Sequence, residues 1–193
     1  AATALARVEK EESEGGESPY RRGRGGTNLG RAVHSVLQSV DLDTGQGLEE
    51  ISRAQAAAEG MPHRWNEIAD LAQRALDSPI VRRAVASGRY YREVFVSAPV
   101  DGVLLEGFID LLFEDDKGLV IVDYKTDTLE SDEEIQRSMD SYRLQGGAYA
   151  LALGKSSGRL VKEAVFLFLQ PQREVIIDDL EGAMADAGKA VVA

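Results

Sequence analysis

The sequence contains no cysteine and only two histidines in 193 residues. The lack of cysteine excludes disulfides, zinc ribbons, thiol catalysis and cysteine-ligated iron–sulfur clusters, and two histidines leave little room for an all-imidazole metal site. No segment approaches the roughly 20 apolar residues of a membrane-spanning helix, which argues against a membrane protein. With 44% hydrophobic and 28% charged residues, we expect a soluble, cytoplasmic, globular protein with one domain, alone or with tails.

The chain is acidic, with a net charge of −11, which by itself argues against a simple basic nucleic-acid binder. The charge is unevenly distributed. Residues 1–100 carry 13 basic and 14 acidic side chains, and residues 141–193 carry 6 of each. Residues 101–140 carry 3 basic and 13 acidic side chains. Nearly all of the acidic excess therefore lies in one window of forty residues, and any functional hypothesis has to account for it.

Composition divides the chain into three parts. Residues 1–26 are expected to be a flexible linker, whose basic stretch 19–26 could touch a nucleic-acid backbone or simply be solvated. Residues 27–179 form the expected domain, and the Ala-rich residues 180–193 a C-terminal tail. The chain begins without methionine, which suggests a piece of something longer.

Apolar periodicity predicts helices first and strands later. The predicted helices cover 27–40, 48–58, 64–76, 78–86 and 131–153, the last opened by a capping box from Ser131 to Glu134. The predicted strands cover 90–97, 103–113, 119–124, 160–169 and 173–177. Helices, a three-strand meander, a helix and further strands are typical of an α/β or α+β domain with a mixed sheet.

A carboxylate pair is predicted in the second hairpin of the meander. If Asp116 and Lys117 are the central turn residues, Asp110 lies directly opposite Asp123, with Cβ atoms about 4.5–5.5 Å apart. Both residues interrupt strongly apolar runs. Two buried carboxylates at that separation need a proton or a cation between them, and a hard divalent ion such as Mg²⁺ suits oxygen ligands.

Lys125 is expected on the same strand face as Asp123, because side chains alternate along a strand. An ammonium group beside such an ion could orient a water molecule or offset the charge of a phosphate. Asp, Asp and Lys around a magnesium-type ion are typical of phosphodiester hydrolysis. A structural Asp–Lys ion pair in the sheet fits these residues equally well.

Four short motifs carry a family resemblance. Gly107-Phe108-Ile109-Asp110 and Val122-Asp123-Tyr124-Lys125-Thr126 resemble motifs II and III of the RecB-family branch of PD-(D/E)XK nucleases. Leu29-Gly30-Arg31-Ala32-Val33-His34 is similar to the motif I helix of that branch, and Gln145-Gly146-Gly147-Ala148-Tyr149 to its Gln-x-x-x-Tyr motif. The motifs follow the family's order across residues 27–153, as in the C-terminal nuclease of RecB/AddA-type (UvrD-like) bacterial helicase–nucleases.

The resemblance implies a restriction-endonuclease-like α/β core, of helix, three-strand meander, helix and strand, with a mixed central sheet and an added helical segment. It implies that His34, Asp110, Asp123 and the main-chain carbonyl of Tyr124 bind Mg²⁺ or Mn²⁺, and that Lys125 is the catalytic lysine. Gln145 and Tyr149 share a helix face. Helix packing alone could explain them, but the resemblance places them beside the metal site or the DNA strand as catalytic residues, which we favour.

The function implied by the resemblance is that of a metal-dependent deoxyribonuclease, an exonuclease with endonuclease activity left open. It would serve as the C-terminal module of a DNA helicase–nuclease in double-strand-break repair and recombination. The implied partners are a single-stranded DNA end delivered by a helicase motor, and a covalently attached helicase or partner subunit. No iron–sulfur cluster is expected, because the sequence has no cysteine. No ATP site is expected either, since Tyr149 replaces the first glycine of a P-loop at Gly154-Lys155-Ser156.

Two alternatives remain open at this point: a catalytically silent nuclease fold used for DNA binding or assembly, and a stand-alone nuclease. Two further acidic residues also have two interpretations. Glu93 could support the site or belong to the polar face of an edge strand. Glu106 has the same strand parity as Asp110 and could reach the site or pair with a basic neighbour.

Overall fold

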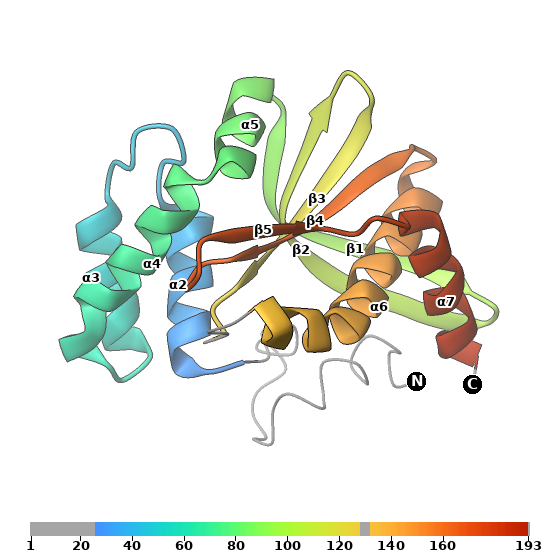
Figure 1. Cartoon of the computed structure of the whole chain (residues 1–193). Coiled ribbons are helices and arrows are strands. Elements are labelled where there is room, and N and C mark those ends of the chain that lie inside the picture. The colour runs from blue at the N-terminus through green and yellow to red at the C-terminus, as the bar shows by residue number, and fades with distance from the viewer. Residues whose placement is uncertain (1–25, 128–131, 193) are drawn as a thin grey trace.

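The computed structural model describes residues 26–127 and 132–192, in which two groups of helices enclose a five-stranded sheet (Figure 1). One group contains α2 (Asn28–Ser39), α3 (Leu48–Ala58), the short 3₁₀ helix η3 (Pro62–Arg64), α4 (Trp65–Asp77) and α5 (Pro79–Ser87). The other contains α6 (Asp132–Ser157) and α7 (Leu180–Val192). Within the described ranges, the helices lack the combination of length and apolarity needed to cross a membrane.

The sheet is mixed, and its spatial order follows the sequence order. The strands are β1 (Tyr90–Val100), β2 (Val103–Asp115), β3 (Gly118–Lys125), β4 (Val161–Phe168) and β5 (Arg173–Ile176). Neighbouring strands are antiparallel except β3 and β4, which are parallel because α6 connects them. Such a parallel pair needs a crossover connection, which a helix supplies. The predicted α/β architecture, with a three-strand meander, a helix and a returning strand, is confirmed.

The first helical group is fixed by short polar caps and an apolar face. Thr27 Oγ1 accepts a hydrogen bond from the Gly30 amide at 3.1 Å and so begins α2. Ser78 separates α4 from α5, and its Oγ accepts a hydrogen bond from the Val81 amide at 3.3 Å. These helices bury a core against one sheet face, where Leu111 and Phe113 are fully buried. This layer therefore covers β3, β4 and the part of β2 that pairs with β3.

The segment 180–193, expected above as a C-terminal tail, forms α7 up to Val192 and packs on α6. Ala183 and Ala187 are buried in the core of this second layer. A Cβ atom at Gly147 would overlap the main-chain carbonyl of Ala183, so glycine at this position allows the two helices to approach closely. The capping-box residue Ser131, predicted to begin the long helix, lies outside the described residues.

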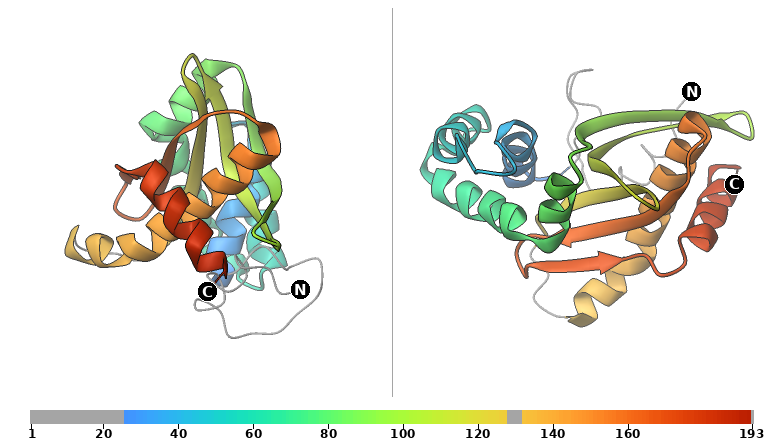
Figure 2. Two further views of the ribbon diagram at one scale, coloured as in Figure 1. Left: turned by 90° about the vertical axis from the view of Figure 1, so that its right-hand side faces the viewer. Right: turned by 90° about the horizontal axis from the view of Figure 1, so that it is seen from above.

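The β1–β2 hairpin changes faces halfway along its length. Leu111 packs toward α2–α5, but Ile109, two residues earlier, packs toward α6 and α7. The change coincides with Glu93 and Asp110, which are not paired in the β1–β2 ladder although their neighbours on both sides are. Glu93 also has a left-handed φ of 51°. Beyond this point the hairpin extends away from α2–α5 and past α6 (Figure 2). Asp110 thus lies where the regular alternation of the sheet breaks.

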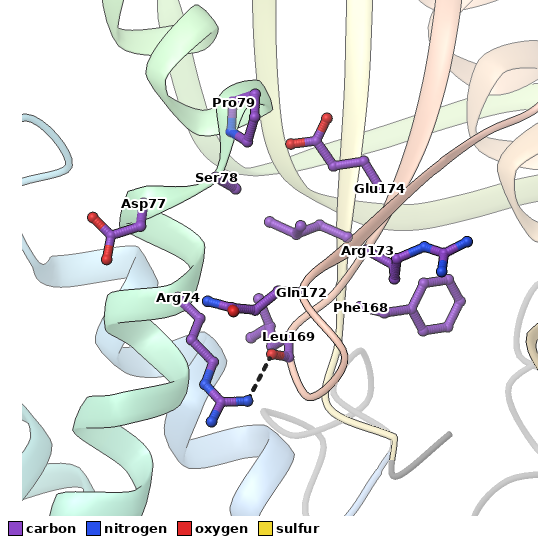
Figure 3. Close-up of a pocket in the computed structure, with 10 residues that line it drawn as sticks. Arg74, Asp77, Ser78, Pro79, Phe168, Leu169, Gln172, Arg173 and Glu174 are labelled. Atoms are coloured by element: carbon purple, nitrogen blue, oxygen red, sulfur yellow. Dashed lines mark hydrogen bonds between the residues drawn. The ribbon is translucent and has the colours of Figure 1, made fainter. Parts of the chain in front are cut away.

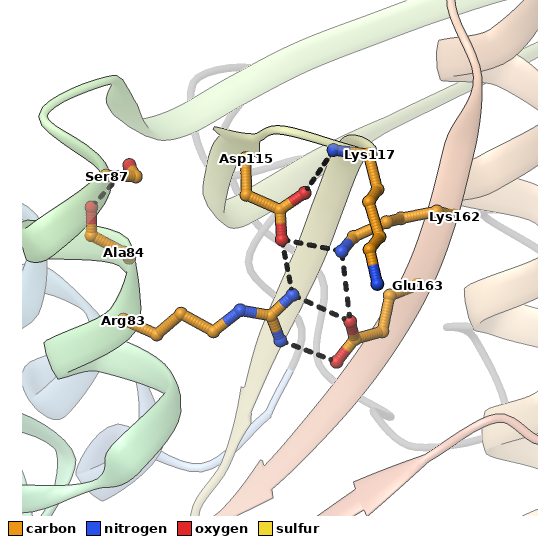
Figure 4. Close-up of polar contacts among 7 residues, drawn as sticks. All are labelled: Arg83, Ala84, Ser87, Asp115, Lys117, Lys162 and Glu163. Atoms are coloured by element: carbon orange, nitrogen blue, oxygen red, sulfur yellow. Dashed lines mark hydrogen bonds and ion pairs between the residues drawn. The ribbon is translucent and has the colours of Figure 1, made fainter.

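The turn end of the β2–β3 hairpin is held by four charged side chains (Figure 4). Arg83 of α5 donates hydrogen bonds to Asp115 at 2.7 Å and to both carboxylate oxygens of Glu163 at 3.0 Å. Lys162 Nζ donates to the same Asp115 oxygen at 2.5 Å. Two acidic and two basic groups therefore join α5, β2 and β4 in one network.

Candidate functional site

The predicted register of the β2–β3 hairpin is confirmed. The ladder begins with Asp115 opposite Gly118 and runs to Leu111 opposite Val122, so the next position places Asp110 and Asp123 opposite one another. The ladder stops there, and Asp110 Oδ2 accepts a hydrogen bond from the main-chain amide of Tyr124 at 2.7 Å. The Asp110 side chain therefore takes over a main-chain hydrogen bond at the point where β2 and β3 separate.

His34 reaches this carboxylate from α2. Its Nδ1 lies 2.9 Å from Asp110 Oδ1, and its side chain is about one-quarter exposed. Burial disfavours the imidazolium form, but the negative charge and hydrogen bond of Asp110, with smaller contributions from Asp123 and Glu93, raise the pKa of His34 to about 9. The predicted helix histidine and strand aspartate are thus brought together across 76 residues of sequence.

Glu93 joins them as a third group with metal-ligating atoms. Those of His34, Glu93 and Asp110 all lie within 4.8 Å of one another. Glu93 has a left-handed φ of 51°, which costs a non-glycine residue roughly 1–2 kcal/mol, and such backbone strain is frequent at functional sites. The sequence contained the signal for this residue: with Asp101-Gly102 as a hairpin turn, Glu93 falls opposite Asp110.

Asp123 is buried beside Lys125, whose Nζ lies 3.1 Å from Asp123 Oδ2. Burial raises the pKa of Asp123 to about 6, since the opposing attraction of Lys125 is itself partly offset by repulsion from Asp110. Asp123 does not belong to the compact group of His34, Glu93 and Asp110. The structure therefore places the predicted ligands in two adjoining parts, one on α2, β1 and β2 and one on β3.

The Lys125 ammonium is held from the side of α6. Lys125 Nζ donates a hydrogen bond to Gln145 Oε1 at 2.8 Å, and Gln145 Nε2 donates to Tyr149 Oη at 3.2 Å. The same ammonium lies 4.8 Å from the ring centroid of Tyr142, within cation–π range. Gln145 and Tyr149 thus form a continuous polar chain with Lys125 and Asp123, which helix packing alone does not require.

Buried polar atoms with incomplete hydrogen bonding provide a test of whether a cation suits this site. In the described part of the chain, three such side-chain atoms make no hydrogen bond of normal geometry: Ser52 Oγ, Asp123 Oδ2 and Tyr124 Oη. Buried polar atoms of this kind are rare. The Asp123 oxygen has its ionic contact with Lys125, and its remaining lone pairs have the hard-donor chemistry that suits a divalent cation. The residues present therefore fit such an ion.

Gly30 of the predicted histidine helix has a packing role at the end of β3. A Cβ atom at Gly30 would lie 2.9 Å from Thr126 Oγ1, too close without a shift of that side chain. Glycine therefore lets α2 approach the segment that follows Lys125. His34, one turn further along α2, is carried toward Asp110 by the same approach.

An open cleft of about 810 Å³ begins directly beyond Lys125. It lies where α2 begins and β3 ends, and it is lined by Gly26, Thr27, Asn28, Leu29, Met61, Arg64, Thr126, Asp127 and Tyr142. Tyr142 Oη donates a hydrogen bond to Asp127 at 2.7 Å across one wall. The predicted site residues do not line this cleft, which is linked to Lys125 by the adjacent Thr126 and by the ring of Tyr142.

A second cavity, of about 340 Å³, lies between α4–α5 and β4–β5 (Figure 3). Two of its charged groups are engaged in the fold. Arg74 donates hydrogen bonds to the carbonyls of Leu169 and Gln170, and Glu174 accepts one from the Ile80 amide at the start of α5. None of the predicted site residues lines it.

A family model described as the PD-(D/E)XK nuclease superfamily matches residues 5–190. The chain belongs to this superfamily. The resemblance identified from the four motifs is therefore confirmed, and the site at the end of the β2–β3 hairpin is the region in which those motifs converge. The metal and catalytic roles of the individual residues stay predictions, as do the domain boundaries at 27 and 179.

The curated relatives of this nuclease domain are longer proteins. It is 29% identical over 169 residues to an ATP-dependent helicase/nuclease subunit of Thermoanaerobacter sp. (strain X514), and 31% identical over 179 residues to the protein of the same name from Bacillus cereus (strain Q1). These matches cover 77% and 78% of the chain but 14% of each relative. The chain therefore corresponds to about one-seventh of these proteins.

A solved structure from Eubacterium rectale, provisionally named an exonuclease, shares the fold of the nuclease domain. Its TM-score is 0.56, with 14% sequence identity, and the match covers 95% of this chain and 76% of the other. The agreement of fold over nearly the whole chain supports the architecture described above.

Proposed function

We propose that this domain is a metal-dependent DNA nuclease that hydrolyses phosphodiester bonds. The observation that carries the proposal is the convergence of His34, Glu93 and Asp110 next to the buried Asp123–Lys125 pair. This gathering of carboxylates is unfavourable without a cation and suits Mg²⁺ or Mn²⁺.

The proposed cation would be held by His34, Asp110 and Asp123, with Glu93 added from the geometry and the Tyr124 carbonyl from the family resemblance. When bound, it would supply Lewis-acid polarisation of a phosphate oxygen and of the attacking water. In the net reaction a water oxygen forms a bond to phosphorus, a P–O bond breaks and the leaving oxygen takes up a proton.

Lys125 would act on the substrate phosphate. Its ammonium is fixed by Asp123 and by Gln145, so it could donate a hydrogen bond to a non-bridging oxygen as negative charge increases in the transition state. Tyr149 would act through Gln145, whose amide it orients. Gln145 and Tyr149 are therefore proposed as positioning residues for Lys125.

We further propose that the domain serves as the exonuclease module of a helicase–nuclease in double-strand-break repair and recombination. Support comes from the relatives named as ATP-dependent helicase/nuclease subunits, of which it matches 14%. A covalently attached helicase would deliver the DNA strand, which would compensate for the acidic net charge of −11.

The decisive experiment measures cleavage of a labelled single-stranded oligonucleotide with Mn²⁺, Mg²⁺ or EDTA. We expect cleavage only with a divalent ion, and its loss in Asp123→Ala and Lys125→Ala. Asp116→Ala, which changes an exposed turn carboxylate of the same hairpin, is the matched control and should keep activity. Metal-dependent cleavage that persists in both site variants would overturn the assignment. Calorimetry showing no Mn²⁺ binding would favour a catalytically silent module.

A further inference from the structure

Exposed apolar side chains line the outer half of the β1–β2 hairpin. Phe95 and Phe108 are 54% and 39% exposed and form a cross-strand pair, with ring centroids 5.2 Å apart and planes tilted by 53°. Leu104 is 43% exposed, and its strand partner Pro99 is also exposed. We call Phe95, Pro99, Leu104 and Phe108 the aromatic platform.

The platform lies on the same sheet face as Glu93 and Asp110, the strand members of the compact group with His34. The residues that alternate with it, including Val96 and Ile109, are buried toward α6 and α7. The platform therefore points to the opposite face, toward which Asp110 extends to meet His34. Helices α2–α5 stop short of this half of the hairpin, as Figure 2 shows.

The distance between the platform and the ligands is short. Phe95 and Phe108 lie two residues along their strands from Glu93 and Asp110, and two residues of a strand span about 7 Å. A nucleic-acid strand with a phosphate at the proposed ligands would therefore bring its neighbouring nucleotides over the two rings.

The polar side chains on this face decide which part of a nucleic acid fits. Between the apolar rows lie Ser97 and Glu106, which face one another across the strands. An acidic and a neutral side chain offer no cation to a phosphate, whereas exposed aromatic rings bind base faces by stacking. In a duplex the base faces are already stacked, so such a surface selects unpaired nucleotides.

We propose that Phe95 and Phe108 are a stacking platform for the bases of single-stranded DNA beside the scissile phosphate. This inference rests on the proposed nuclease function and adds to it a surface that positions the unpaired bases next to the scissile phosphate. Continuity with the ligand group favours DNA as the occupant over a second protein.

The test compares equilibrium binding of two labelled oligonucleotides of equal length and charge, an oligothymidylate and an abasic strand. Binding to the full 193-residue chain is measured by fluorescence anisotropy, and EDTA in the buffer prevents metal-dependent cleavage. We expect tighter binding of the oligothymidylate. Phe95→Ala/Phe108→Ala should weaken it about tenfold, equivalent to about 1.4 kcal/mol, and leave the abasic strand unchanged. Phe95→Tyr/Phe108→Tyr should retain the preference.

Tyr91→Ala is the matched control, because Tyr91 is a 61% exposed aromatic residue of the same strand outside the platform. It should bind both oligonucleotides as the wild type does. Equal affinity of the wild type for the two strands, including no measurable binding of either, overturns the platform. The platform is also overturned if the double alanine variant loses affinity for both oligonucleotides equally or for neither. The second result is the one expected of a protein-docking surface. Base-dependent binding without metal-dependent cleavage would instead contradict the proposed nuclease activity alone.

Discussion

The two ends of the β2–β3 hairpin both carry acidic and basic side chains, but the pKa of the central aspartate is lowered at one end and raised at the other. At the turn, the ammonium of Lys162 and the guanidinium of Arg83 hold the pKa of Asp115 well below its ordinary value. At the other end, burial raises the pKa of Asp123 to about 6 despite the adjacent Lys125. The protein's own basic side chains therefore stabilise the ionised carboxylate at the turn, but they do not fully compensate the buried carboxylate at the candidate site.

The difference locates functional acidity within an acidic chain. Both ends lie inside the window of residues 101–140, which carries 3 basic and 13 acidic side chains. At the turn, neutralisation comes from Arg83 and Lys162, both outside that window. At the site, Asp123 stays difficult to ionise although Lys125 and His34 both attract its charge. An incompletely compensated buried charge reduces stability unless a ligand offsets it, which is typical of a binding site.

The largest effect is expected from Asp110→Asn at the site end of the hairpin, compared with Asp115→Asn at the turn end. Asp110→Asn should reduce metal-dependent DNA cleavage by at least about 10³-fold, because it removes a charge from the proposed ligand group. Asp115→Asn should keep activity near that of the wild type. Initial cleavage rates at saturating Mn²⁺ check both. Equal losses in the two variants would indicate a general effect of hairpin charge and would contradict the site assignment.

Arg83→Met tests whether the turn end depends on its cations. Arg83 contacts both Asp115 and Glu163, so its loss leaves two half-buried carboxylates with Lys162 alone. We expect unfolding free energy to fall by about 2 kcal/mol, discounted from buried pairs because the arginine is partly exposed. Urea denaturation measures the change. Arg82→Met, which alters an exposed neighbour paired with Asp77, should cost less than about 0.5 kcal/mol.

The elements and the hairpin register could be predicted because they depend on local signals. The Asp115–Gly118 turn sets the register that places Asp110 opposite Asp123, and the strand ladder confirms this register as far as Leu111 opposite Val122. The helix ends have the same local origin: Thr27 is the N-cap of α2, and Gly88 is the C-cap of α5. Short-range capping and turn chemistry requires no knowledge of tertiary structure.

The remaining features depend on contacts that strand periodicity does not encode. Asp110 turns toward His34 because β1 and β2 switch faces at Glu93, and a period-2 pattern assumes uninterrupted alternation. The Ala-rich residues of α7 carry a weak pattern, and their helix is buried through the close approach at Gly147. The sequence named His34, Glu93 and Asp110 as candidates, but their convergence within 4.8 Å depends on this change of face.

Asp123→Asn should stabilise the metal-free protein while removing activity. A carboxyl group whose folded pKa is raised costs stability in its charged form, so the cost is fully present above about pH 6 and absent below its ordinary value near 4. We expect the variant's unfolding free energy to exceed that of the wild type by about 1–2 kcal/mol at pH 8 in EDTA. The gain should disappear near pH 4. Added Mn²⁺ should reverse the ranking, because only the wild type gains binding energy.

Asp115→Asn is expected to have the opposite and smaller effect. The folded pKa of Asp115 lies below its ordinary value, so the ionised group stabilises the fold above about pH 4, and this contribution is lost as the pH falls through the folded pKa. The variant should lose about 1 kcal/mol or less at pH 7, and the difference from wild type should shrink in acid. Thermal unfolding followed between pH 3 and pH 8 measures both aspartate variants side by side. Curves of the same sign for Asp115→Asn and Asp123→Asn would contradict the contrast between the balanced turn and the unbalanced site.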